Sequence, residues 1–292
     1  MYNQISSNKL KSYLLMLLFF LVIIGIVWAW SLYFGENSGY TTLIFAVILA
    51  TVMNLISFFA GDSIALGIAG AKPINKEANA YVYRMVENLS ITAGLPTPKV
   101  YIINDSAMNA FATGRDPKHA SIALTTGIIE GLENEELEGV IAHELSHVKN
   151  YDIRLMMIVI VCVGIIALMA DWLTRSLFWR NRDSDNRNNN AVFMIIGLVL
   201  AILSPLFAKL IQLAISRKRE YLADASGALL TRYPEGLARA LEKISSQKQA
   251  LKHANKATAH LYIANPFGSE KMANLFSTHP PVASRITALR SM

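Results

Sequence analysis

The sequence predicts an integral membrane protein that is mainly α-helical, with about four transmembrane helices and a water-facing α+β domain that holds a small sheet. Of its 292 residues, 53% are hydrophobic and 16% are charged, whereas soluble domains carry about 25% charged residues. This composition also excludes a disordered chain. The charges are unevenly placed, because residues 12–71 contain only Glu36 and Asp62 while residues 72–154 contain 19 charged residues. Charge-poor runs that alternate with charged segments indicate membrane helices attached to a domain in water.

Two apolar runs, at about 13–34 and 40–60, predict a transmembrane hairpin within residues 1–71. Each run reaches the roughly 20 apolar residues that a helix needs to cross a bilayer. The first run exceeds the roughly 7–15 residues of a signal peptide, and it ends in aromatic residues typical of the membrane interface. Because Lys9 and Lys11 precede this run, we expect the amino terminus to face the cytoplasm.

Two further runs, at about 155–173 and 191–208, predict a second hydrophobic hairpin within residues 155–208. The uncharged part of the third run is shorter than a full membrane span, and the fourth run contains Pro205. Buried or interfacial helices are therefore the alternative to two spans. The connection at 175–187 is rich in arginine, which opposes the positive-inside rule if it lies outside the cell. We expect both runs to span, with this loop as the unresolved exception.

Residues 72–154 and 209–292 are expected to form the two halves of one water-facing domain, which the second hairpin divides. In the first half, short stretches at 100–104, 110–113 and 121–125 alternate with turn residues and predict strands. A small sheet in this half therefore follows.

A helix is predicted to run from Asn134 to about Val148. Asn134 is the expected N-cap, because its side chain can accept a hydrogen bond from a free backbone N–H of the first turn. Several glutamates follow it, at the end where the helix dipole favours negative charge.

Residues 143–147 of this helix read His-Glu-Leu-Ser-His, the H-E-x-x-H motif. His143 and His147 lie about 40° apart around a helix, so both imidazoles can bind one Zn²⁺. Glu144 projects beside the metal, where it can take a proton from water and pass it to a leaving amine. The alternative is a solvated helix with two exposed histidines. Apolar neighbours predict instead a buried helix, whose polar groups need a partner such as a metal.

A catalytic zinc takes a third protein ligand and keeps one position for water. The extended motif that requires glycine at 150 and histidine at 153 is excluded, because these residues are Asn150 and Ile153. Glu220 and Asp224, four residues apart on another expected helix, are the candidates. One would bind the metal while the other accepts the N–H of a liganding histidine, and an ordinary exposed Glu220 is the alternative. Because Glu220 follows the third and fourth apolar runs, it can meet His143 only if these two runs cross the membrane twice or not at all.

The basic balance of the chain, a net charge of +6 and a pI near 9.3, does not predict a nucleic-acid partner. Residues 72–154 carry 8 basic against 11 acidic residues, and much of the surplus follows Lys209. Arg217, Lys218 and Arg219 stand directly behind an apolar run, as basic residues do at the cytoplasmic end of a span. The expected partners are the lipid bilayer and protein or peptide substrates.

Four motifs occur in order around the apolar runs: Asn-Ala-Phe-Ala-Thr-Gly at 109–114, the H-E-x-x-H at 143–147, residues 217–224, and Thr-His-Pro-Pro at 278–281. With them, nearly the whole chain resembles the HtpX family of bacterial membrane-bound zinc metalloproteases, which is related to the CAAX prenyl proteases. The resemblance implies a zincin-like metalloprotease domain that faces the cytoplasm at the cell membrane. It also implies a role in the quality control of membrane proteins under stress.

The same resemblance implies His143, His147 and Glu220 as ligands of one Zn²⁺ and Glu144 as the catalytic acid and base. Asp224 is then left to orient a liganding histidine.

The other motifs supply candidate substrate contacts, Asn109, Ala110, Phe111 and His279. The strand at 110–113 is expected to lie at a sheet edge and to pair with an extended substrate backbone, and a core strand beside a turn is the alternative. His279 is expected either to donate a hydrogen bond to the oxyanion or to cap the loop before a C-terminal helix.

The predicted function is therefore that of a membrane-anchored zinc endopeptidase that cleaves misfolded or damaged membrane proteins. The main alternative is a non-catalytic membrane scaffold or assembly factor with a structural zinc, which would have four protein ligands and no open position. A CAAX-type processing protease is disfavoured by the small number of apolar runs. An iron oxygenase with two histidines and a carboxylate has no need for Glu144.

Overall fold

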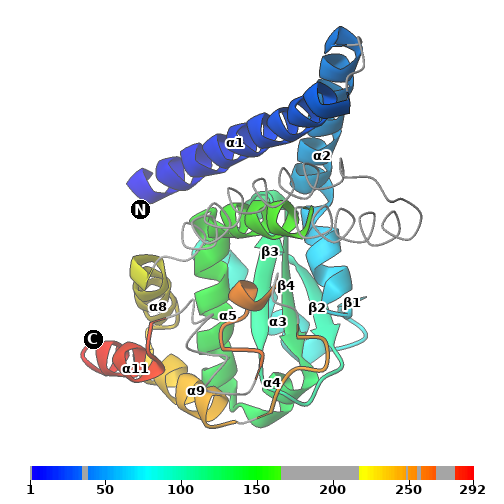
Figure 1. The fold of residues 1–292 in the computed structure, drawn as a ribbon. Helices are drawn as coiled ribbons and strands as arrows, with labels where there is room; N and C mark the ends of the chain where they lie inside the picture. The colour runs from blue at the N-terminus through cyan, green and yellow to red at the C-terminus, as the bar shows by residue number, and fades with distance from the viewer. Residues whose placement is uncertain (1, 35–38, 166–216, 248, 255–257, 268–279) are drawn as a thin grey trace.

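The structure is a computed structural model and describes residues 2–34, 39–165, 217–247, 249–254, 258–267 and 280–292. Its elements, in chain order, are α1 (Tyr2–Phe34), α2 (Gly39–Ile68), β1 (Ala71–Ile74), α3 (Ala80–Ala93), β2 (Lys99–Ile103), β3 (Ala110–Gly114), η1 (Pro117–His119), β4 (Ala120–Thr125), α4 (Thr126–Gly131), α5 (Asn134–Lys149), α8 (Arg217–Thr231), α9 (Pro234–Ser246), η2 (Ala259–Leu261) and α11 (Val282–Arg290). In Figure 1, α1 and α2 project from a domain in which helices surround one small sheet.

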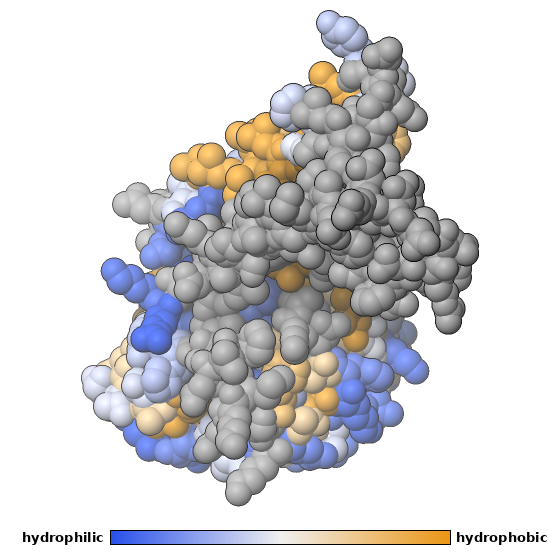
Figure 2. Space-filling view, in the orientation of Figure 1, coloured by the Kyte–Doolittle hydropathy of each residue, from blue (hydrophilic) through white to orange (hydrophobic). Residues whose placement is uncertain are grey.

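The helices α1 and α2 pack against each other and contain the two predicted N-terminal spans. By length and composition, the segments Gln4–Trp28 and Tyr40–Ile68 are able to cross a membrane. Large apolar side chains such as Leu14, Leu21 and Phe45 are exposed on them, and Figure 2 shows apolar residues gathered along α1, while much of the visible domain surface is polar. A lipid environment would cover this apolar surface.

The sheet has four strands in the order β1-β2-β4-β3, so β3 lies at one edge. The strand β4 runs parallel to β2 and antiparallel to β3, and β1 is antiparallel to β2. The predicted strands at 100–104, 110–113 and 121–125 correspond to β2, β3 and β4. The sequence did not predict β1, because it directly follows a long apolar helix.

Side chains of alternate strand residues point to opposite faces of the sheet and into two cores. Ala112 and Ile122 belong to the core shared with α3, α5 and α9. Phe111 and Ala123 belong to a second core that includes buried residues of α1 and α2. The sheet is therefore fixed to the domain helices on one face and to the apolar helices on the other.

The N-cap of α5 is Glu133 rather than the predicted Asn134. The carboxylate of Glu136 accepts a hydrogen bond from the backbone N–H of Glu133 at 2.9 Å, which forms the return half of a capping box. Asn134 is the first helical residue, and its amide oxygen instead accepts a hydrogen bond from the hydroxyl of Tyr81. The capping box between Glu133 and Glu136 therefore fixes the N-cap at Glu133.

The third apolar run begins as a helix over residues 152–165. Its residues 155–162 are buried, and a Cβ on Gly61 of α2 would come within 2.7 Å of Met157, so the two helices are in close contact. The rest of this run, the arginine-rich loop and the fourth run lie outside the described residues. The prediction that both runs span the membrane stays a prediction.

Candidate metal centre

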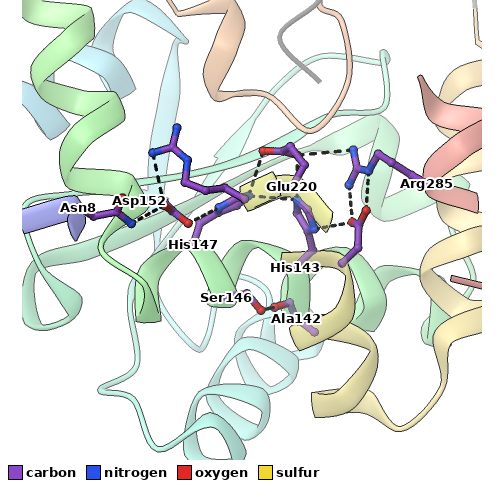
Figure 3. A network of polar contacts seen from close by, with 10 residues as sticks. Asn8, Ala142, His143, Ser146, His147, Asp152, Glu220 and Arg285 are labelled. Atoms are coloured by element: carbon purple, nitrogen blue, oxygen red, sulfur yellow. Dashed lines mark hydrogen bonds and ion pairs between the residues drawn. The ribbon is translucent and has the colours of Figure 1, made fainter. Parts of the chain in front are cut away.

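The helix α5 places the H-E-x-x-H motif inside the domain. His143, Glu144 and His147 are each at most 5% exposed, so a solvated helix with exposed histidines is excluded. The two imidazole rings are nearly perpendicular, and their Nε2 atoms lie 3.2 Å apart. This is the arrangement expected of side chains one helical turn apart, with both Nε2 atoms directed to one point (Figure 3).

Glu220 reaches the same point from α8, although it lies 73 positions after His147 in the sequence. Its two carboxylate oxygens lie 3.8 Å from Nε2 of His143 and 3.7 Å from Nε2 of His147. One atom from each of the three residues falls within 4.8 Å of the others. Glu220 is 7% exposed, so it is not an ordinary surface residue. The structure thus brings together the three residues that the sequence proposed as ligands.

A glycine allows α8 to approach α5 closely enough for this contact. A Cβ at Gly227 would lie 3.0 Å from the backbone nitrogen of His143, tighter than nearly all real contacts of this kind. Because Gly227 and Glu220 are two turns apart on α8, the close crossing of the two helices fixes the distance from which Glu220 reaches the histidines.

Asp224 contacts His143 from the side opposite Nε2. Its Oδ1 lies 3.0 Å from His143 Nδ1, and Arg285 of α11 donates to both of its oxygens at 2.6 and 2.8 Å. Burial would raise the pKa of Asp224, but the hydrogen bonds from His143 and Arg285 outweigh it and lower the pKa to about 2. Arg285 is fully buried and its pKa is raised, because the Asp224 hydrogen bond outweighs burial. Sequence reasoning missed Arg285, which follows Thr-His-Pro-Pro without any spacing that marks a role.

Asp152 stands in the equivalent position for His147. Its Oδ2 lies 3.1 Å from His147 Nδ1, and its Oδ1 lies 3.6 Å from Arg219. Burial would lower the pKa of His147, but the Asp152 hydrogen bond and the Glu220 carboxylate outweigh it and raise the pKa to about 9. The sequence signal for Asp152 was weak, since it comes five residues after His147 and beyond the end of α5.

Glu144 is 2% exposed and lies beside the three converging residues. Burial raises its pKa, and the neighbouring Glu220 carboxylate adds to this rise. The two histidines and the backbone N–H of Ala112 in β3, which donates to Glu144, act against it. Glu144 therefore links the motif to the edge strand of the sheet.

The charges of this buried network fit a divalent cation. Four carboxylates and two guanidinium groups belong to it: Glu144, Asp152, Glu220, Asp224, Arg219 and Arg285. With both imidazoles neutral, as metal binding requires, and all four carboxyl groups ionised, negative charges exceed positive ones by two, and a dication would balance them. Two imidazole nitrogens and one carboxylate oxygen form a donor set typical of catalytic zinc sites.

The candidate substrate residues Asn109, Ala110 and Phe111 lie at or next to the edge strand β3 and are buried. The chain itself covers this edge in part. The amide of Asn109 donates to the carbonyl of Ala264 at 3.0 Å, and Ala110 accepts a hydrogen bond from the N–H of Ile263. Phe111 packs edge-on against Tyr262. The predicted edge position is therefore observed, while its first residue is paired with another segment of the domain. His279 lies outside the described residues.

Comparisons with known proteins agree with these motifs. Residues 76–292 match Peptidase family M48. The chain is 44% identical to a Protease HtpX homolog of Dictyoglomus turgidum over 100% of this chain and 94% of that protein. It is 44% identical to one of Caldanaerobacter subterraneus subsp. tengcongensis (100% and 98%) and 42% identical to one of Streptococcus uberis (100% of each). The crystal structure of S. mikatae Ste24p aligns with a TM-score of 0.48 at 22% identity, over 99% of this chain and 66% of that chain.

Proposed function

The chain belongs to peptidase family M48 and is a metalloprotease similar to HtpX homologues over its whole length, and we propose that it is a zinc endopeptidase of the cell membrane. Its role would be to cleave misfolded or damaged membrane proteins in membrane quality control and the stress response. The observation that carries the proposal is the convergence of His143, His147 and Glu220 on one point with Glu144 beside it.

In this proposal, His143, His147 and Glu220 hold one zinc ion per chain. Asp224 and Asp152 would each accept the Nδ1 proton of one histidine, which keeps both Nε2 atoms unprotonated and directed to the metal. The chemistry that zinc supplies when bound is polarisation of the scissile carbonyl and acidification of a water molecule.

Glu144 would act as the acid and base of the reaction. A carboxylate whose pKa is raised by burial can accept a proton from water and return it to the leaving amine near neutral pH. The Ala112 N–H that donates to Glu144 would hold the carboxylate beside β3, where the substrate is expected.

The edge of β3 beyond Ala110 is the proposed site of substrate pairing. Ala110 is already paired with Ile263 and the N–H of Ala112 with Glu144, so an extended peptide would pair with the remaining backbone groups of this edge, next to Glu144. Backbone pairing of this kind tolerates many sequences, which suits a protease that removes damaged proteins. Asn109 and Phe111 would shape this edge by holding the segment around Tyr262, and His279 is proposed as a donor to the oxyanion.

The two apolar helices support a membrane anchor. Lys9 and Lys11 before the first apolar run favour a cytoplasmic amino terminus. An even number of spans before the H-E-x-x-H helix would then place the catalytic domain in the cytoplasm, and a spanning second hairpin would make the protein multi-pass.

A cleavage assay with metal removal tests this function. Purified full-length protein in detergent micelles would be incubated with unfolded casein and with a destabilised membrane protein, before and after chelation. We expect cleavage to stop on chelation and to return with one equivalent of zinc. Cleavage that persists in metal-free protein would contradict the proposal. A non-catalytic zinc scaffold predicts no cleavage in either state and a fourth protein ligand; among the described residues, the group able to hold a metal has three members.

A further inference from the structure

The first turns of the membrane helix α1 reach the turn that follows α5. Asn8 is 1% exposed, and its amide nitrogen donates to the carbonyl of Asn150 at 2.9 Å and to Oδ1 of Asp152 at 2.7 Å. Asn150 is the C-cap of α5. These contacts join residues that lie 142 and 144 positions apart in sequence, and Figure 3 shows Asn8 at one end of the polar network.

The turn between Asn150 and Asp152 has a strained backbone. Tyr151 has a φ of 60°, in the left-handed region that side chains with a Cβ rarely adopt, and such residues persist where the surroundings hold them. The Nζ of Lys9 lies 4.3 Å from the Tyr151 ring centroid, within the range of a cation–π contact. Asn8 and Lys9, adjacent on α1, therefore hold the three residues of this turn.

This turn also sets the position of Asp152 relative to His147. One oxygen of the Asp152 carboxylate accepts from Asn8, and the other lies 3.1 Å from His147 Nδ1. A carboxylate fixed at one oxygen has fewer orientations available at the other. The Asn8 amide therefore restricts the acceptor that holds the His147 ring.

We propose that Asn8 is a positioning residue of the metal centre, so that the first membrane helix is a working part of the site as well as an anchor. The proposal rests on the proposed function, in which His147 binds zinc through Nε2. Partners of liganding histidines commonly change metal affinity by about 10–100-fold when removed. Asn8 acts one step further away, through Asp152, so we expect a loss of about tenfold at most from its removal. A displacement of α1 would weaken the centre by the same route.

Zinc affinity of the full-length protein, measured by chelator competition in detergent, tests the proposal. The variants are Asn8→Ala, the near-isosteric Asn8→Leu, Asp152→Ala and the double variant N8A/D152A. Ser12→Ala is the matched control, since Ser12 is equally buried on α1 and, within the described residues, its hydroxyl donates to the helix carbonyl of Asn8 alone. Circular dichroism and thermal unfolding identify any variant that has lost its fold.

We expect both Asn8 variants to bind zinc severalfold to tenfold more weakly, while S12A stays within twofold of the wild type. In the Asp152→Ala background, the Asn8 substitution should have no further effect on zinc affinity, because its route to His147 is gone. Wild-type zinc affinity in folded N8A and N8L, or additive effects in the double variant, would overturn the inference while leaving the proposed function intact. A wild-type protein that takes up no zinc would overturn the proposed function itself.

Discussion

Replacement of Arg285 by methionine is the perturbation that the structure predicts most sharply. The guanidinium of Arg285 is fully buried. It makes two hydrogen bonds to Asp224, at 2.6 and 2.8 Å, and lies 3.8 Å from Glu220. Methionine fills much of the same space but has no charge, so R285M would remove the buried cation that pairs with Asp224 and lies beside Glu220.

The cost follows from the burial of these carboxylates. Removal of one partner from a buried ion pair typically destabilises a protein by about 3–5 kcal/mol. The lowering of the Asp224 pKa from 3.8 to about 2 corresponds to about 2 kcal/mol, shared between His143 and Arg285. For a domain of this size, about 3–5 kcal/mol lowers the unfolding midpoint by roughly 6–20 °C. Zinc would restore part of the loss, because its charge would lie beside Glu220.

Thermal unfolding of metal-free and zinc-loaded protein in the same detergent measures this effect. Arg290→Met is the matched control, since Arg290 also lies on α11 and also pairs with two carboxylates, but at the surface. Exposed ion pairs contribute little, so R290M should unfold close to the wild type. An R285M midpoint within about 2 °C of the R290M midpoint would refute the argument that Arg285 neutralises buried charge.

Three further predictions concern the metal and the helix crossing. Glu220→Ala should lower the zinc content of purified protein well below one equivalent, and unchanged stoichiometry would remove Glu220 from the site. Because the pKa of His147 is raised from 6.5 to about 9, zinc must displace a proton from His147 at neutral pH. The apparent zinc affinity should therefore rise by up to about tenfold per pH unit between pH 7 and 9 and then level off. A zinc affinity that does not change with pH in chelator competition would contradict this. Gly227→Ala should destabilise the protein by about 1–3 kcal/mol and weaken zinc binding, because the added Cβ would lie 3.0 Å from the backbone nitrogen of His143. A G227A variant that unfolds and binds zinc as the wild type does would show that α5 and α8 do not need to cross this closely.

The parts of the site that repeat with helical spacing could be predicted from the sequence. His143 and His147 are one turn apart, so their common face follows from helix geometry alone. Glu220 and Asp224 have the same spacing, and the structure places one of them beside both Nε2 atoms and the other beside Nδ1 of His143. The short strands could also be predicted, because turn residues separate them.

The groups that support these residues were not predictable. Arg285, Asp152 and Asn8 come from three different elements, and tertiary packing alone brings them to the site. Nothing in their sequence neighbourhood distinguishes them from surface residues. The position of Glu133 as the cap of α5 illustrates a smaller error, because a capping box placed the N-cap one residue before the asparagine that residue preference favoured.

The central claim is that Glu144 performs proton transfer beside a zinc held by three other side chains, and one measurement tests it directly. Zinc content and cleavage of unfolded casein would be measured on the same preparations of wild type, Glu144→Gln and Glu135→Gln, the last an exposed glutamate on the same helix. We expect one zinc per chain in all three proteins, with cleavage lost in E144Q alone. Cleavage by zinc-loaded E144Q at the wild-type rate would contradict the account.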